Sequence, residues 1–164
     1  MPKRDIPLYD ERFTNIRDIL YGLGSTSESA AGPIGTYIDV LVFAASYGIR
    51  KNAFIPTTKN GLLIPESVIK NGQYDRIISA FAMMHTGKAE TILDLEEAYK
   101  IFSGYANGGF DLIENLFEEK KAIQGDDKIE ELLMIIQEIA LENEKNVKKT
   151  KKKWLKIPKA CYLT

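Results

Sequence analysis

Apolar residues recur at helical spacing near the start of the chain. The intervals are four, three and four residues for Tyr9, Phe13, Ile16 and Leu20. This stripe predicts an amphipathic helix that ends near Gly22 or Gly24. Residues 24–35 are small and polar, with glycine and proline among them, so they predict a loop.

The most apolar stretch, residues 36–52, holds one carboxylate, Asp39. Thr36 and Asp39 are three residues apart, as at helix starts where both side chains accept backbone N–H groups. Asp39 would also meet the positive end of the helix dipole. The pattern favours a helix cap over a functional acid, and both remain open from the residues alone. Beyond Asp39 nearly every helical face is apolar, which predicts a core helix that stops at Gly48.

Residues 53–65 predict a small β-hairpin. Two short apolar runs lie on either side of a polar segment, and Asn60-Gly61 is a two-residue turn signal. Pro56 and Pro65 restrict this hairpin to an edge ribbon on a helical body.

Helical periodicity returns at residues 75–87, from residue 94, from residue 110 and after Gly125. Asp75 is expected to cap the first of these helices and Gly87 to end it. Asn107-Gly108-Gly109 is expected to break the helix that starts at residue 94. The fold predicted is mainly α: a compact single-domain helical bundle of five or six helices with a short β-hairpin insertion.

Composition supports one such domain. The chain has 164 residues, of which 45% are apolar, enough for a core without disulfide or metal support. Charges are spread through residues 1–18, unlike a secretory signal, and the apolar run from Tyr37 is too short to span a membrane. We therefore expect a cytoplasmic protein with no membrane contact. Cys161 is the only cysteine, which excludes an internal disulfide and any cysteine-rich zinc site.

The charge is strongly asymmetric along the chain. All 23 acidic residues and 14 of the 22 basic residues lie in positions 1–144, which gives that part a charge of −9. Residues 145–164 hold the other eight lysines and no acid, for a charge of +8. We therefore expect a helical domain over residues 1–144 and a basic C-terminal arm over residues 145–164.

The basic arm is the candidate binding segment for nucleic acid or an acidic partner. Lysines can neutralise phosphates while a tryptophan stacks on a base. The candidate residues are Lys148, Lys149, Lys151, Lys152, Lys153, Trp154, Lys156 and Lys159. Two other interpretations remain open: a solvated tail that aids solubility, and packing of Trp154 against the body.

Catalytic and metal motifs are missing from the sequence. His85 is the only histidine and lies at the end of an apolar segment, where a structural role is favoured over a catalytic one. No phosphate loop, zinc motif or calcium loop occurs. The visible acidic clusters are Glu96-Glu97, Asp111-Glu114 and Asp126-Asp127, and they fall mostly in first helical turns. We assign no catalytic residue, metal ligand or cofactor, and a magnesium site remains an alternative.

Two ordered blocks resemble a known family. The first holds Thr36, Tyr37, Asp39, Leu41, Val42, Phe43, Ala44, Ala45 and Gly48, and the second holds Tyr105, Ala106, Asn107, Gly108 and Gly109. In these blocks, and over about residues 8–122, the chain is similar to the DNA phosphorothioation (Dnd) system-associated protein 4 family. The resemblance implies a bacterial protein encoded beside genes that replace a non-bridging phosphate oxygen of DNA with sulfur, or beside the linked restriction genes. It carries over no catalytic residue.

The resemblance and the basic arm together predict a non-enzymatic accessory protein of a DNA phosphorothioation-dependent modification and restriction system that acts in antiphage defence. It is expected to act by contact with DNA, with a partner subunit, or both, and the partners expected are other proteins of that system. One alternative is a magnesium-dependent nuclease of the same system. Another is a purely structural subunit that does not contact DNA.

Overall fold

The computed structural model describes residues 5–22, 34, 36–59, 61, 63–119, 130–138 and 141. The chain divides into two compact units, residues 1–121 and residues 122–164. The described residues are mainly helical, with one two-stranded antiparallel sheet. The predicted fold class is therefore confirmed.

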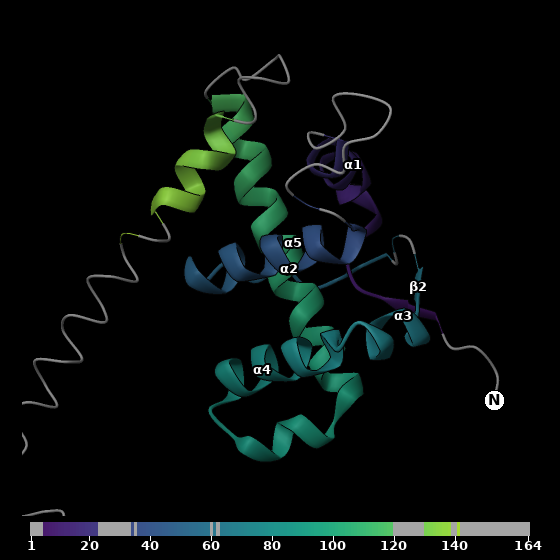
Figure 1. Cartoon of the computed structure of the whole chain (residues 1–164). Coiled ribbons are helices and arrows are strands. Elements are labelled where there is room, and N and C mark those ends of the chain that lie inside the picture. The colour runs from purple at the N-terminus through teal and green to yellow at the C-terminus, as the bar shows by residue number, and fades with distance from the viewer. Residues whose placement is uncertain are drawn as a thin grey trace, which may run out of the picture. The chain divides into compact units, whose positions relative to one another are not determined.

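The first unit is built around one long helix, α5, which α2 crosses (Figure 1). The sheet and α3 lie to one side of this crossing, and α4 and η2 lie at one end of the unit. In chain order the elements are β1 (Asp5–Pro7), η1 (Glu11–Phe13), α1 (Thr14–Gly22), α2 (Tyr37–Arg50), β2 (Leu63–Pro65), α3 (Glu66–Asn71), α4 (Tyr74–Thr86), η2 (Ala89–Leu93) and α5 (Leu95–Glu119). In the second unit, residues 130–138 are helical, within the segment where the sequence predicts the last helix.

The N-terminal stripe is buried as predicted, but only part of it lies in a regular helix. Tyr9 precedes η1, Phe13 ends η1, and Ile16 and Leu20 lie in α1. All four residues of the stripe are 1% exposed: Tyr9, Phe13, Ile16 and Leu20. Asp10 caps η1 because its carboxylate accepts the backbone N–H of Arg12 at 3.2 Å. The predicted loop over residues 24–35 lies outside the described residues except for Ile34.

Thr36 caps α2, as the sequence predicts. Its Oγ1 accepts the backbone N–H of Asp39 at 3.2 Å and donates to the Asp39 carboxylate at 2.7 Å. The predicted stop at Gly48 is wrong, because α2 continues to Arg50. Gly48 instead lies where α2 crosses α5, and a Cβ there would stand 2.1 Å from the carbonyl oxygen of Tyr105. Its small size permits the crossing, which explains a glycine inside the helix.

The predicted break at Asn107-Gly108-Gly109 is also wrong, because α5 is continuous through it. A Cβ on Gly109 would stand 1.8 Å from the carbonyl oxygen of Ala44, on α2. A Cβ on Gly108 would stand 2.0 Å from the carbonyl oxygen of Ala53. These glycines let other parts of the backbone approach α5, and tertiary packing outweighs their low helix propensity.

The small sheet joins distant parts of the chain. Strand β2 is antiparallel to β1, with Ile64 opposite Ile6 and Pro65 opposite Asp5. The first strand of the ribbon is thus β1, and residues 53–57 of the predicted hairpin are extended without forming a strand. Those residues are held by α5 instead, as described below.

Helix α4 ends at Gly87 as predicted, since Gly87 has a left-handed backbone (φ 68°) and donates its N–H to Met83 at 2.8 Å. Asp75 is not its N-cap. The helix begins one residue earlier, at Tyr74, so Asp75 lies inside the first turn, where its charge suits the helix dipole.

Candidate functional site

Residues 53–59, which we call the extended segment, are fixed by one backbone hydrogen bond to α5 and one to α2. The N–H of Ile55 donates to the carbonyl oxygen of Gly104 at 2.9 Å, and the N–H of Ala53 donates to that of Gly48 at 2.8 Å. A Cβ on Gly104 would stand 2.3 Å from the ring of Phe54. The glycines of α5 therefore form the surface against which this segment lies.

Asn107 links three parts of the chain and has no exposed surface. Its Oδ1 accepts the backbone N–H of Asp10 at 2.7 Å. Its Nδ2 donates to the carbonyl oxygen of Ile55 and to Oγ1 of Thr57, both at 3.1 Å. The Thr57 hydroxyl also hydrogen bonds with the Ser103 hydroxyl. A buried network with satisfied partners fixes one arrangement of these segments.

Asp10 holds the far end of the same segment and is 3% exposed. Its Oδ2 accepts the N–H and the hydroxyl of Thr58, each at 2.7 Å, and the N–H of Lys59 at 3.1 Å. Burial by itself would raise the pKa of Asp10. The hydrogen bonds from Thr58, Arg12 and Lys59 outweigh burial and hold that pKa far below its ordinary value of 3.8.

A cleft of about 470 Å³ opens beside this braced segment. Apolar side chains from β1, the extended segment and α5 line it together with three hydroxyl-bearing side chains and three charged groups. The lining residues are Asp5, Ile6, Pro7, Phe54, Pro56, Thr57, Glu96, Tyr99, Lys100 and Ser103. Mostly apolar walls with a few polar groups are typical of a binding cleft.

Among the described residues, the Ser103 hydroxyl of the cleft is not paired with a general base. The Ser103 hydroxyl is bonded to Thr57, and a neutral threonine hydroxyl is no general base. His85 lies behind Phe54, where its ring stacks at a centroid distance of 5.5 Å and its Nδ1 hydrogen bonds with the Tyr105 hydroxyl at 2.8 Å. His85 therefore supports the wall of the cleft.

Acidic groups do not gather into a metal site in the part of the chain that the structure describes. No group of three or more His, Cys, Asp or Glu side chains is arranged there to hold an ion. Burial and the charges of Glu118 and Asp111 raise the pKa of Glu114. The third predicted cluster, Asp126-Asp127, lies outside the described residues.

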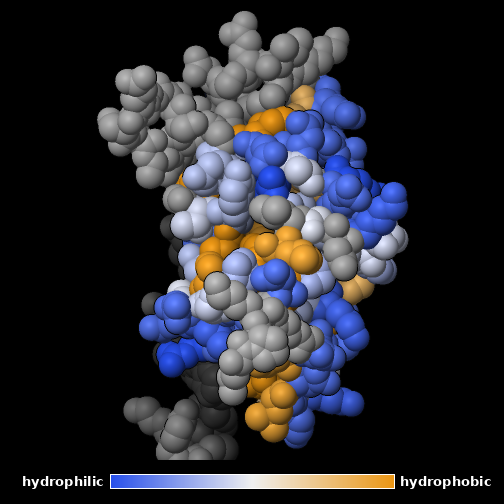
Figure 2. Space-filling view, turned by 90° about the vertical axis from the view of Figure 1, so that its right-hand side faces the viewer, coloured by the Kyte–Doolittle hydropathy of each residue, from blue (hydrophilic) through white to orange (hydrophobic). Residues whose placement is uncertain are grey.

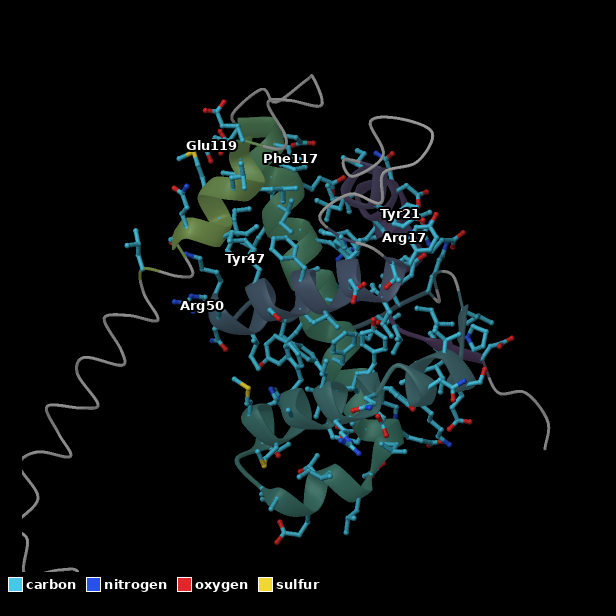
Figure 3. All side chains as sticks on the ribbon, viewed as in Figure 1. Arg17, Tyr21, Tyr47, Arg50, Phe117 and Glu119 are labelled. Carbon is cyan, nitrogen blue, oxygen red and sulfur yellow. The ribbon has the colours of Figure 1, made fainter. Side chains whose placement is uncertain are left out.

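A second polar cluster joins α1 to the start of α2 (Figure 3). Arg17 is 5% exposed, donates to the Tyr9 hydroxyl and pairs with Asp18. Its guanidinium lies 4.5 Å from the ring centroid of Tyr37, which in turn lies 4.3 Å from that of Tyr21. This cation–π arrangement secures α1 against α2.

The predicted binding residues of the basic arm, Lys148 to Lys159, lie outside the described residues. The sequence pattern does not predict the cleft or the hydrogen bonds of Asn107 and Asp10 that hold its wall. One signal was present in the sequence: an asparagine followed by two glycines within an otherwise apolar helical stretch. That signal indicates close backbone contact as readily as a helix break.

Comparison with known proteins identifies one family. A family model described as DNA sulphur modification system-associated protein 4 matches residues 16–153, most of the chain. No curated protein and no solved structure gives a significant match. Within the described residues, no helix has the length and apolar character needed to cross a membrane.

Proposed function

Because the chain belongs to the family of DNA sulphur modification system-associated protein 4, we propose that it is a non-enzymatic, cytoplasmic accessory subunit of a bacterial DNA phosphorothioation system. Family membership associates it with a DNA sulphur modification system. In our proposal the cleft holds a segment of a partner protein of that system, while the basic arm contacts DNA. In this proposal the subunit acts in phosphorothioation-dependent restriction and thereby in antiphage defence.

The braced cleft is the observation that carries this proposal. Residues of the second family block support it: Gly108, with Gly104 just before the block, lets the extended segment lie close to α5, and Asn107 fixes that segment by hydrogen bonds. The result is a preformed groove with apolar walls and charges of both signs at its rim. Such a groove suits an extended peptide with an apolar side chain and polar flanks, because a preformed site reduces the entropic cost of binding.

The charge distribution along the chain supports the proposed contact between the basic arm and DNA. Residues 1–144 carry −9 and repel a phosphate backbone, whereas residues 145–164 carry +8. A lysine-rich segment attached to an acidic body binds DNA through its phosphates and without sequence readout.

Co-purification of the full chain from its native operon tests the partner half. Two exposed charged residues, Lys100 and Glu96, line the cleft, so the double variant Lys100→Glu with Glu96→Lys reverses the charge at both positions. We expect this variant to retain its melting temperature and to lose partner retention several-fold. The control Glu119→Lys, at the far end of α5, should retain the partner (Figure 3). Retention by the cleft variant equal to that of the control would place the partner elsewhere.

A cleavage assay with magnesium distinguishes the alternative function. The purified chain is incubated with modified and unmodified DNA, with and without Mg²⁺. An accessory subunit leaves both substrates intact. Magnesium-dependent cleavage that persists through purification and is lost in a variant of an acidic cluster would establish a nuclease.

A further inference from the structure

Helix α4 has two apolar faces, of which one is buried and one is exposed. Ile78 and Ala82 have no exposed surface and pack inward. On the other face Ile77 is 39% exposed and Met84 is 66% exposed, with the exposed Ala80 between them. Spacings of three and four residues place these three side chains in one stripe. An ordinary surface helix needs only the inward stripe.

The exposed apolar surface continues from α4 onto η2. Ile92 is 42% exposed and Leu93 is 87% exposed, so Leu93 projects almost fully into solvent. Between α4 and η2 lies a groove of about 510 Å³ with Ala80 and Met83 on one side. Figure 2 shows a hydrophobic patch at the lower end of the first unit, the end at which α4 and η2 lie in Figure 1.

We propose that this surface, which we call the α4–η2 face, binds the same face of a second copy of this chain. The two α4 helices run antiparallel about a two-fold axis near Ala80. One turn before Ala80 is Ile77, and one turn after it are Met83 and Met84. The axis then places Ile77 of each copy against the methionines of the other, while the small Ala80 lets the helices approach closely.

The groove and the exposed leucine fit the same arrangement. A two-fold interface must carry a projection and a matching hollow on one patch, since each copy supplies both. Leu93, on the η2 side of the groove, is the projection on this face, and the groove between Leu93 and α4 is the hollow. Methionine side chains adapt to such a partner because they are flexible and polarisable.

Charge complementarity favours the antiparallel direction. Asp75 lies in the first turn of α4, and the exposed Lys88 lies two residues beyond the end of the helix. His85 does not contribute to this face, because its ring contacts Phe54 and Tyr105. Antiparallel pairing brings the acidic start of each helix toward the basic end of its partner and places opposite ends of the helix dipoles together. Arg76, exposed on the same face, then lies near the carbonyl end of the partner helix.

Sedimentation velocity of the full chain tests the proposal. We expect the wild-type chain to be a dimer. Ala80→Arg should raise the dissociation constant of that dimer by at least about thirtyfold, the effect of mutating one interface hot-spot residue. The matched control is Val68→Arg, which places the same charge at a 46% exposed apolar position of α3 and should leave the dimer intact. Circular dichroism checks that both variants fold. A monomeric wild-type chain, or a dimer unaffected by Ala80→Arg, would overturn the proposal.

Cross-linking at the axis tests the symmetry independently. Cys161 is the only cysteine, so a Cys161→Ser background leaves one thiol in each designed variant. On the axis, Ala80→Cys meets its own copy and should form an intermolecular disulfide rapidly on oxidation by copper–phenanthroline. The Val68→Cys variant should stay monomeric under denaturing conditions. If both variants cross-link equally, the disulfides arise from random collisions between chains, and the α4–η2 face is not the dimer interface. Because the cleft does not enter this test, its outcome is independent of the proposed partner binding.

Discussion

Oδ1 of Asn107 accepts the backbone N–H of Asp10 at 2.7 Å, across 97 positions of sequence. The same side chain holds the extended segment through Ile55 and Thr57, and Asp10 holds it through Thr58 and Lys59. Two polar residues thus fix the segment that forms one wall of the cleft. Each of the two supports the position of the other.

Asn107→Ala should destabilise the chain by about 2–4 kcal/mol. The variant leaves the buried N–H of Asp10 without its acceptor and removes both hydrogen bonds donated by Nδ2. It also leaves a small cavity where the amide was. Chemical denaturation monitored by circular dichroism measures the change in the free energy of unfolding.

Asn115→Ala is the matched control on the same helix. Asn115 is exposed, and its amide donates only to Asp111 one turn away, at 3.1 Å. Its loss should change stability by less than about 0.5 kcal/mol. Equal costs for Asn107→Ala and Asn115→Ala would show that the buried network contributes nothing specific.

Gly109→Ala should destabilise the chain by about 3 kcal/mol or more, although alanine is the better helix former. The propensity gain is at most about 1 kcal/mol. Against it stands a Cβ only 1.8 Å from the carbonyl oxygen of Ala44, which would force α2 away from α5. Gly87→Ala provides the contrast, because a Cβ there meets no atom within 4 Å. Its cost should be only the strain of a left-handed alanine, about 1 kcal/mol.

Asp10 should give the chain an acid-sensitive component of stability. Its folded pKa lies below the ordinary value of 3.8, so Asp10 stabilises the fold fully above about pH 5 and less as pH falls through 4 and below. The stability gap between the wild type and Asp10→Asn should therefore be largest near neutral pH and shrink toward pH 3. Denaturation curves at a series of pH values measure the gap. A gap that stays constant with pH would contradict the depressed pKa.

The sequence predicts a helix correctly where its start, its buried face or its end is set by residues within the same segment. The Thr36 cap, the stripe from Tyr9 to Leu20 and the stop at Gly87 all follow from hydrogen bonds or spacing within one segment. These features depend on neighbours a few residues away, which sequence patterns record.

Features that depend on distant segments were predicted wrongly or not at all. Gly48, Gly108 and Gly109 indicate helix ends in isolation, yet each is required for contact with another part of the backbone. The partner of β2 is a three-residue strand near the N-terminus with its own proline, too short to give a periodic signal. The cleft combines β1, the extended segment and α5, so no single window of sequence contains it.

Asp39→Asn should cost only about 0.5–1 kcal/mol, since asparagine keeps an oxygen for the cap but loses the charge at the helix start. Asp39 also accepts the Tyr74 hydroxyl at 2.8 Å. That hydrogen bond, together with burial, raises the pKa of Tyr74. In Asp39→Asn the pKa of Tyr74 should fall toward its ordinary value, as followed by NMR of ring-labelled tyrosine. Loss of defence with an unchanged melting temperature would identify Asp39 as functional instead.

Removal of residues 145–164 should leave the fold of the body intact and abolish most nucleic-acid binding. A body with a charge of −9 repels phosphates, and only the +8 segment can release condensed counterions from DNA. The full chain should bind without sequence preference. If arm lysines engage about five phosphates, the log–log salt slope on duplex DNA should be roughly −4 to −5.

Trp154→Ala separates stacking from charge in the same segment. Every lysine remains, so duplex binding and its salt slope should change little. If the indole stacks on bases, affinity for single-stranded DNA should fall by about 1–3 kcal/mol, because unpaired bases offer open faces that a duplex hides. Mobility shifts with full-length, truncated and Trp154→Ala chains at two salt concentrations make the comparison. Equal binding by full-length and truncated chains would move the DNA site onto the body, while no binding by either would favour an acidic protein surface as the partner of the arm.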